Sequence, residues 1–493
     1  MDDHGKKNHL WHCTVGRGRV RCCHGLALCA TEAGGDHENE YKRLFSSSPH
    51  GRKGTVLMRS RMRFLTVLIA LALVAAACVE STEDTTTTTA APEPVTTQAE
   101  TPDTTSAPEP LPDPPAEIVI GNPIALSGGN EAGSLLSQVP SYDLWAADVN
   151  AAGGIYVAEF DASIPVRIER VDDTSDVGTA VQLTQQMLES GEIDFYFPPW
   201  GTAFNFAIAP IVSEFQMPTA GCTVGSSELV ENAAEYPYFY TLLNQAPAQA
   251  AGLVELLQDV GVTSVAIIHH DDLFGIEFSA AVEPALAEVE IEVAFKETYP
   301  LGTADFTQIL RGAQDSGADA FLAFSYPPET FPMTGQAIGI EFSPDLFMAA
   351  VGVAFPAYRD AFGPAAEGVV GTGVWNPNVD IEDAQGFFDR HVAMHDAEPD
   401  RWASAACYAT GQVLQQAIEA AGTLDPVKVK EAMDTIEFDT IIGTFSFDNQ
   451  VNPVYPGQIG QWQDGEFEII SHTADRTAEP IFPKGAWPPP PEE

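Results

Sequence analysis

From residue 117 onwards, short apolar runs alternate with segments whose apolar residues recur at helical spacing. Apolar runs of about four to eight residues are typical of buried strands, and recurrence every three or four residues is typical of helices. The first half of this region contains predicted strands at 118–126, 165–173, 193–201 and 217–227, and predicted helices at 141–154, 178–190 and 202–215. Alternating strands and helices predict a parallel sheet with helices on both faces, which is the α/β class.

The same alternation begins again after residue 242. The predicted helices are 249–259, 277–289, 306–317, 329–340 and 403–421, and the predicted strands are 264–268, 292–300, 318–328, 345–353, 443–448 and 459–470. Two successive α/β units of similar order predict two lobes with a ligand between them.

The stretch Thr263–Gly275 shows where that ligand is expected. Its apolar strand ends at Ile268 and is followed by a polar loop at 269–272. Ligands of open α/β sheets bind at the carboxyl ends of the strands. A metal site is not predicted for the two histidines in this loop, because adjacent residues point apart and no third ligand follows at a suitable spacing. The two aspartates are expected to cap the next helix.

The amino terminus contains a secretory pattern. Residues 1–57 show no amphipathic period, and we expect translation to begin at Met58. A basic segment, an apolar segment at 64–74 and small residues before Cys78 then follow, and the apolar segment is too short for a bilayer that needs about 20 residues. The cysteine makes the segment resemble a bacterial lipobox, so a lipid-modified Cys78 is predicted. The alternative is an ordinary signal peptide.

The segment that follows the cysteine consists almost entirely of threonine, proline, alanine and acidic residues, from 79 to 115. Such a composition cannot form a core and predicts a disordered tether. The proline-rich tail, 483–493, is also expected to be loose.

Charge and cysteine content limit the possible functions. The net charge is −47, and the first 78 residues hold 12 of the 23 basic residues but only 6 of the 70 acidic ones. The remaining, strongly acidic chain would repel nucleic acid, so a nucleic-acid role is excluded. Its charge indicates solubility, with a cationic partner as the alternative. Beyond the signal segment only Cys222 and Cys407 occur, as a disulfide pair or as two buried thiols.

Several segments, in order, resemble the leucine/isoleucine/valine-binding proteins, the branched-chain amino-acid type of ABC-transporter substrate-binding protein. They are Leu126-Ser127-Gly128, DVNAAGGI (148–155), RVDDTSD (170–176), EFQMPTAGCTVGSSEL (214–229), AIIHHDDLFG (266–275), DFTQILRGAQDSGADAF (305–321) and GPAAEGVVG (363–371). The resemblance covers about residues 117–472. No single motif is specific, whereas their order and spacing are.

This resemblance implies the type I periplasmic-binding fold, with two Rossmann-like lobes, parallel sheets and a three-segment hinge near 243–245, 372–376 and 441–452. The expected organisation is an extension (1–57), signal peptide (58–78), tether (79–115), lobe 1 (116–244), lobe 2 (245–372), lobe 1 return (373–442), lobe 2 return with hinge (443–482) and tail (483–493). It further implies closure on a small-molecule ligand, docking on a membrane permease, a monomer, and no cofactor.

The resemblance also implies which residues hold the ligand. First-lobe hydroxyls and loop amides would hold a carboxylate, whereas second-lobe residues would hold an ammonium group and close an aromatic ring over the ligand. The matching positions are Ser127, Trp200, Gly201, Thr202, Thr223, Val224, Gly225, Phe274, Tyr326 and Val351.

Two departures change the expected ligand. Gly225 stands where the family usually has threonine, and Val351 stands where it usually has an acid. An unpaired ammonium group is costly to bury, so an amino acid would need Asp271, Asp272 or Glu329 instead. The predicted loops are rich in flat apolar side chains, namely Trp200, Phe204, Phe274, Phe324, Tyr326 and Trp375. The alternative for these aromatic residues, Phe204 and Phe324 above all, is a place in the core of a lobe. We therefore expect a small carboxylate or amide with an apolar body.

Three classes of function remain to be compared. The leading prediction is an extracytoplasmic solute-binding lipoprotein of an ABC importer for amino acids or related carboxylates and amides. The alternative is the ligand-sensing module of a receptor or amide-type regulator. An enzyme is not predicted, because the sequence contains no GxSxG, P-loop or HExxH motif.

Overall fold

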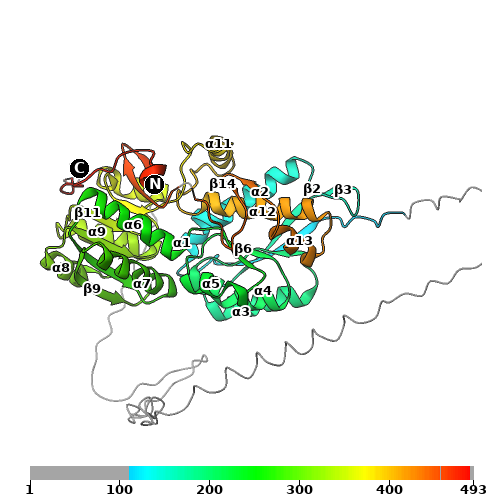
Figure 1. The fold of residues 1–493 in the computed structure, drawn as a ribbon, viewed down its shortest axis with the longest axis horizontal. Helices are drawn as coiled ribbons and strands as arrows, with labels where there is room; N and C mark the ends of the chain where they lie inside the picture. Colours follow the sequence, from blue (N-terminus) through cyan, green and yellow to red (C-terminus); the bar gives the residue numbers. More distant parts are fainter. Residues whose placement is uncertain (1–109, 456, 489–493) are drawn as a thin grey trace, which may run out of the picture. The chain divides into compact units, whose positions relative to one another are not determined.

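The computed structural model describes residues 110–455 and 457–488 (Figure 1). The extension, the signal peptide, the lipid site at Cys78 and most of the tether are predictions that lie outside the described residues. Among the residues described, no helix has the length and apolar character needed to cross a membrane.

The first lobe is built on a small parallel sheet in the order β4-β1-β5. These strands are β1 (Ile118–Ile124), β4 (Val166–Asp172) and β5 (Phe195–Tyr196), and a second parallel pair joins β6 (Thr219–Gly221) to β7 (Phe239–Thr241). Six of the seven residues of β1 are fully buried, as expected for a strand covered on both faces.

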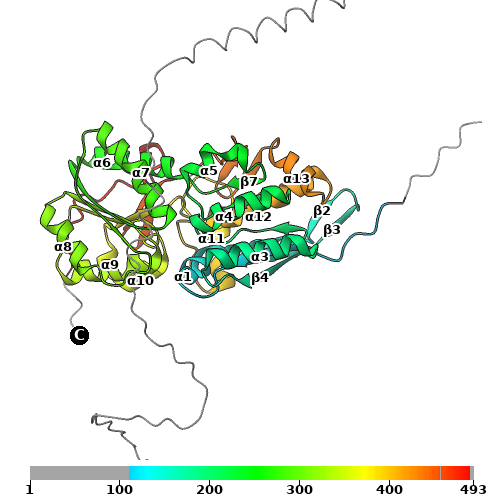
Figure 2. The ribbon, with the colours of Figure 1, turned by 90° about the horizontal axis from the view of Figure 1, so that it is seen from below.

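Helices cover this sheet and later segments of the chain complete the lobe (Figure 2). The helices are α1 (Glu131–Gly133), the π-helix η2 (Ser134–Gln138), α2 (Val139–Ala151), α3 (Val177–Ser190), α4 (Thr202–Glu214), α5 (Ser227–Glu231), α11 (Ala384–His395), α12 (Ser404–Ala421) and α13 (Pro426–Met433). Two hairpins pair β2 (Ile155–Val157) with β3 (Ala162–Ile164) and β13 (Phe438–Thr440) with β14 (Gly443–Phe445). The return helix α12 packs against α2.

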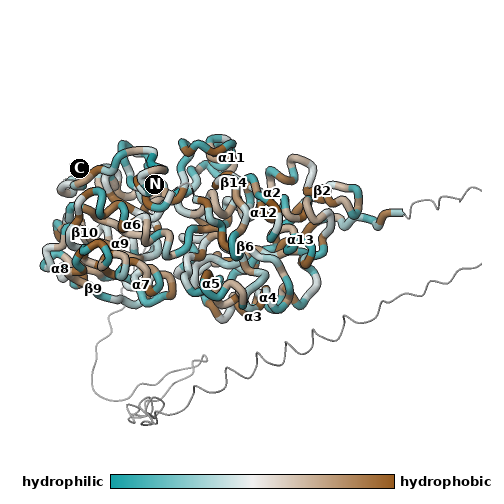
Figure 3. Tube along the Cα trace, viewed as in Figure 1, coloured by the Kyte–Doolittle hydropathy of each residue, from teal (hydrophilic) through white to brown (hydrophobic). Residues whose placement is uncertain are grey.

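The second lobe contains a seven-stranded sheet in the order β16-β15-β12-β11-β10-β8-β9. Its strands are β8 (Ser264–His270), β9 (Glu292–Tyr299), β10 (Ala320–Phe324), β11 (Leu346–Ala349), β12 (Val370–Thr372), β15 (Ile459–Gln463) and β16 (Glu466–Ser471). The first five are parallel, and β15 and β16 are antiparallel. Its helices are α6 (Ala246–Val260), α7 (Leu273–Glu288), α8 (Thr307–Ser316), α9 (Pro327–Gly339) and α10 (Pro356–Phe362). Hydrophobic and hydrophilic stretches alternate along both lobes (Figure 3).

The chain crosses between the lobes three times, after β7, after β12 and after β14. These crossings fall at the three predicted hinge segments. Gln458, which lies between β14 and β15, bonds to the other two crossings: its side chain accepts a hydrogen bond from Asn244, and its carbonyl accepts one from the Gly373 N–H at 3.3 Å. The predicted lobe boundaries themselves stay a prediction.

Two local predictions were wrong. The strand expected to end at Ile268 continues through His270, and both histidines of the expected polar loop are buried.

The described part of the tail, 483–488, is packed rather than loose. The Trp487 indole donates to the Phe342 carbonyl at 2.7 Å and lies edge-on to Phe347. The apolar ring and the N–H of the indole therefore hold this segment against the second lobe.

The structure resolves the two alternatives for the cysteines. Cys222 and Cys407 form a disulfide with a Cα–Cα distance of 5.0 Å. The bond ties the loop after β6 to α12, so it links the first part of the first lobe to its return segment.

Candidate functional site

The first-lobe wall of the site is the loop that opens α4. Gly201 is the N-cap of this helix and has φ +101°, a conformation that favours glycine. Its N–H donates to the Thr223 hydroxyl at 3.2 Å, and the Thr202 hydroxyl accepts from the Gly225 N–H at 3.2 Å. The two predicted first-lobe loops are therefore joined in one unit. This unit lies at the amino terminus of α4, where the helix dipole has its positive end.

Side chains beneath these loops fix their shape. The Thr223 hydroxyl donates to the Gln138 amide oxygen at 3.3 Å, and the Val224 carbonyl accepts from the Gln245 amide at 3.0 Å. The Trp200 indole N–H donates to the Ser137 hydroxyl at 3.2 Å. Gln138 and Ser137 lie in η2, which the sequence pattern did not predict.

The second-lobe wall is aromatic. Tyr326, directly after β10, stacks on Phe274 of α7 with ring centroids 5.3 Å apart and planes within 14°. The Tyr326 hydroxyl donates to the Asp272 carboxylate at 3.2 Å. Asp272 is the N-cap of α7 and accepts from the Phe274 N–H, so the capping prediction is confirmed for this aspartate. The His270 ring lies 4.6 Å from the Tyr326 ring.

The two walls touch. The Tyr326 ring lies edge-on to Trp200 at 4.9 Å, and Trp402 packs on Trp200 at 5.8 Å. All three side chains are almost completely buried. Eight predicted residues thus gather at the meeting of the lobes, and we call them the interlobe cluster: Trp200, Gly201, Thr202, Thr223, Val224, Gly225, Phe274 and Tyr326. Trp402 was missed because its loop follows a long return segment without a sequence signal of its own.

The other two predicted residues lie beside this cluster. The Ser127 hydroxyl donates to Asp172 at 2.7 Å, which holds the loop after β1 against the loop after β4. Val351 is buried after β11, where its N–H donates to the Ser325 carbonyl and its carbonyl accepts from the Thr330 hydroxyl. Its backbone polar groups are therefore already paired within the second lobe.

Two other aromatic residues from the predicted loops belong to the core, which was the alternative stated for Phe324. Phe324 is the last residue of β10 and stacks on Phe278 at 4.3 Å. Trp375 is fully buried and lies edge-on to Phe387. Phe204 is buried on α4, near the cluster, where its ring would lie 3.7 Å from a Cβ placed on Gly201.

The charge states of the second-lobe wall follow from burial. Desolvation raises the pKa of Asp272 and of Glu329 from their ordinary values. Desolvation lowers the pKa of His270 to about 3, so its imidazole is neutral at physiological pH. Asp271, in contrast, accepts from the Leu301 N–H at 2.8 Å. Of the three acids considered for an ammonium group, Asp272 accepts from the Tyr326 hydroxyl of the interlobe cluster, and Glu329 accepts from the Gly302 N–H at 2.7 Å.

A carboxylate joins the lobes at one edge of the cluster. Glu277 of α7 accepts from the Ser226 hydroxyl at 2.8 Å, and from the backbone N–H groups of Ser227 and Glu228, the latter at 3.4 Å. It therefore caps α5 of the first lobe from the second lobe. Desolvation raises the pKa of Glu277.

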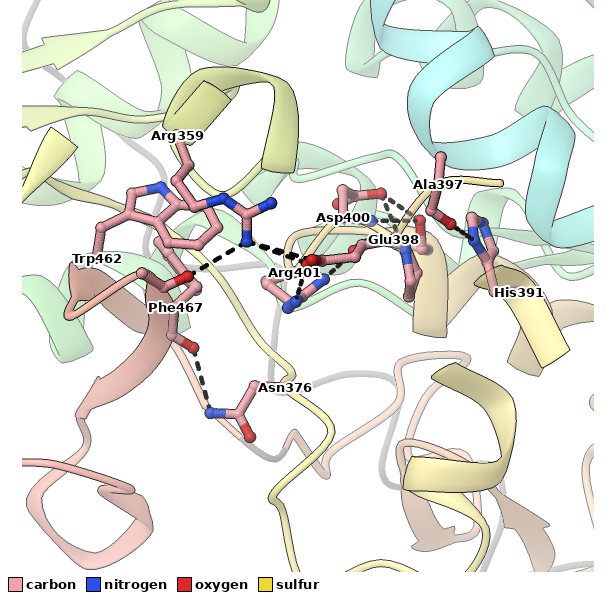
Figure 4. A network of polar contacts seen from close by, with 12 residues as sticks. Arg359, Asn376, His391, Ala397, Glu398, Asp400, Arg401, Trp462 and Phe467 are labelled. Atoms are coloured by element: carbon pink, nitrogen blue, oxygen red, sulfur yellow. Dashed lines mark hydrogen bonds and ion pairs between the residues drawn. The ribbon is translucent and has the colours of Figure 1, made fainter. Parts of the chain in front are cut away.

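An ion-pair network joins the lobes elsewhere (Figure 4). Glu398, before α12, pairs with Arg359 of α10 at 3.2 Å and with the buried Arg401 at 2.7 Å. The Arg401 N–H donates to the Ala354 carbonyl of the second lobe at 3.0 Å. A pocket of about 360 Å³ lies beside this network, lined by α10 and by Leu136, Val392 and 396–398 of the first lobe.

The sequence model of the periplasmic binding protein family matches residues 117–466. The chain belongs to this family. It is similar to the Leu/Ile/Val-binding protein homolog 7 of Brucella abortus, with 21% identity over 388 residues that cover 73% of this chain and 92% of the relative.

Two solved structures show the same fold. The branched-chain amino-acid substrate-binding protein LivJ of Streptococcus pneumoniae, in complex with isoleucine, has a TM-score of 0.63 and 18% identity, covering 71% of this chain and 97% of that chain. A solute-binding protein of R. palustris, in complex with 4-hydroxybenzoate, has a TM-score of 0.61 and 20% identity, covering 74% of this chain and 98% of that chain.

These comparisons confirm the predicted family resemblance and the two-lobed α/β fold. The relatives are solute-binding proteins rather than enzymes, and family membership implies an extracytoplasmic location.

Proposed function

We propose that this protein is a lipid-anchored solute-binding protein that delivers a small carboxylate or amide with an apolar body to an ABC importer. The observation that carries the ligand class is the interlobe cluster, in which hydroxyls and backbone amides of the α4 loop face a wall of aromatic rings. Ser127 and Val351 complete the proposed site at its margins.

The two walls suit the two ends of such a ligand. Amides and hydroxyls at a helix amino terminus stabilise a carboxylate. The rings of Trp200 and Phe274 suit an aromatic or aliphatic body. An ammonium group finds less support, because position 351 holds no acid and Asp272 already accepts from Tyr326 and from the α7 backbone. The R. palustris relative that binds 4-hydroxybenzoate supports this choice.

A thermal-shift screen of the purified chain tests the ligand class. One set contains branched-chain and other α-amino acids, and the other contains aromatic and aliphatic carboxylates and amides. A ligand at about 100 times its Kd adds about 2.7 kcal/mol to the free energy of unfolding, which is easily measured. We expect a response to the second set, reduced in Thr202→Ala. A response to amino acids alone would contradict the proposal and favour Asp272 as the ammonium partner.

The anchor and the importer have separate tests. Intact-mass analysis of the native membrane form should show a diacylglyceryl group on Cys78, with translation starting at Met58. An unmodified species beginning at Met1 would overturn the anchor. Deletion of the gene should abolish high-affinity uptake of the ligand found by the screen, whereas the sensor alternative predicts unchanged uptake and a lost transcriptional or signalling response.

A further inference from the structure

The ring of Tyr326 is enclosed on several sides by aromatic groups. Phe274 stacks on it at 5.3 Å, the His270 ring lies 4.6 Å away, and the edge of Trp200 lies 4.9 Å away. Only 3% of Tyr326 is exposed. We call Trp200, Phe274 and His270 the aromatic box. It combines residues of both lobes around a single phenol ring.

The hydroxyl of Tyr326 also has close neighbours. It donates to the Asp272 carboxylate at 3.2 Å. A Cβ placed on Gly201 would lie 3.9 Å from the phenol oxygen, so this oxygen reaches the loop that opens α4. Burial raises the pKa of Tyr326 well above its usual value and the Asp272 charge adds to this rise, whereas the backbone N–H and the hydroxyl of Thr202 act in the opposite direction. The phenol oxygen thus lies where the proposed site would place a polar oxygen of the ligand.

We propose that Tyr326 is an internal occupant of the ligand site, whose phenol fills the aromatic box when the lobes meet and must leave it when ligand binds. This inference rests on the proposed function, which puts the ligand between the lobes. It also narrows the ligand class to a small aromatic ring that carries a hydroxyl, because a hydroxyl can donate to Asp272 as the phenol does. The observed affinity is then reduced by the population in which Tyr326 occupies the box.

The proposal makes Tyr326 a competitor of the ligand rather than part of its wall, and the two roles predict opposite results. In Tyr326→Ala, removal of a competitor should tighten binding of the ligand found by the screen at least tenfold. Removal of a wall residue would weaken it. Tyr326→Phe keeps the ring but loses the bonds of the hydroxyl, so it should tighten binding by a smaller factor and keep the fold.

Binding of p-cresol, an analogue of the truncated tyrosine side chain, gives a second measurement. Apolar cavities left by truncation bind small aromatic molecules, so p-cresol should raise the melting temperature of Tyr326→Ala by several degrees and leave the wild type unchanged. Tyr358→Ala is the matched control, because Tyr358 is fully buried in the second lobe and its hydroxyl bonds to Thr334. The ligand found by the screen should compete with p-cresol in Tyr326→Ala and should not compete with it in Tyr358→Ala. Binding of p-cresol to Tyr326→Ala that the ligand leaves unchanged would overturn the proposal.

The outcomes separate this inference from the proposed function. If the screen finds a carboxylate or amide ligand that binds Tyr326→Ala more weakly than wild type, the proposed function stands and the internal-occupant role is wrong. If neither protein responds to any carboxylate or amide while p-cresol stabilises Tyr326→Ala specifically, the box binds phenols and the proposed function is wrong.

Discussion

Among single residues, His270 makes the stability of the folded protein depend on pH. Burial lowers the pKa of its imidazole to about 3, whereas the unfolded chain has a value near 6.5. The unfolded state therefore binds one more proton than the folded state between these pH values, and the contribution of His270 to stability falls as the pH falls below 6.5. Between pH 6.5 and pH 5 the loss is about 2 kcal/mol.

This loss should disappear in His270→Gln. The free energy of unfolding, measured by chemical denaturation at several pH values, should show a difference between wild type and variant that changes by about 2 kcal/mol from pH 7 to pH 5. From pH 7.5 to pH 8.5 the difference should be constant, which serves as the internal control. A constant difference over the whole range would show that the imidazole titrates normally in the folded protein.

The sequence predicted much of the residue-level arrangement, because loops at the carboxyl ends of parallel strands meet at one edge of a sheet. Trp200 and Tyr326 are examples, and each lies in the loop between a parallel strand and the next helix. Trp402 and Glu277 could not be predicted in the same way. Trp402 reaches Trp200 across about 200 residues of sequence, and Glu277 was one of many acids until the structure placed it at α5.

Among the elements, the packing of α12 on α2 depends on a glycine. A Cβ placed on Gly411 would lie 2.2 Å from the Trp145 ring, which is buried and leaves little room to move. Gly411→Ala should therefore lower the free energy of unfolding by about 1–3 kcal/mol. The control is Gly335→Ala in α9, where a Cβ meets nothing within 4 Å. That variant should be neutral or more stable by up to about 1 kcal/mol. Equal effects in chemical denaturation would contradict the packing argument.

Element types could be predicted where the apolar period was long, as in α12 and β1, but the ends of elements depended on partners far away in the sequence. The strand β8 extends through two histidines because β9 pairs with the backbone of both and with the ring of His269. The Thr298 hydroxyl bonds to the His269 ring at 3.0 Å, and the His270 backbone pairs with Tyr299. A polar residue can remain buried in a strand when a neighbouring strand satisfies it, and a single segment does not show that partner.

In the molecule as a whole, the Cys222–Cys407 disulfide closes a loop of 185 residues that includes the entire second lobe up to β12. Constraining so long a loop in the unfolded chain contributes about 2–5 kcal/mol. The double variant Cys222→Ser, Cys407→Ser should lose that amount in chemical denaturation. A reducing agent should destabilise the wild type by a similar amount and leave the variant unchanged. Equal stability of wild type and variant would show that the constraint contributes nothing.

Closure of the two lobes depends on Glu277, the second-lobe carboxylate that caps α5. Hydrogen bonds to a charged group are worth about 1.5–3 kcal/mol, so Glu277→Ala should shift the lobes toward an open form and weaken ligand binding roughly tenfold or more. Small-angle scattering should give a larger radius of gyration for this variant without ligand. Glu283→Ala is the matched control, because Glu283 also lies on α7 but pairs with Lys296 of its own lobe. Identical scattering and affinity in the two variants would show that the cap does not hold the lobes together.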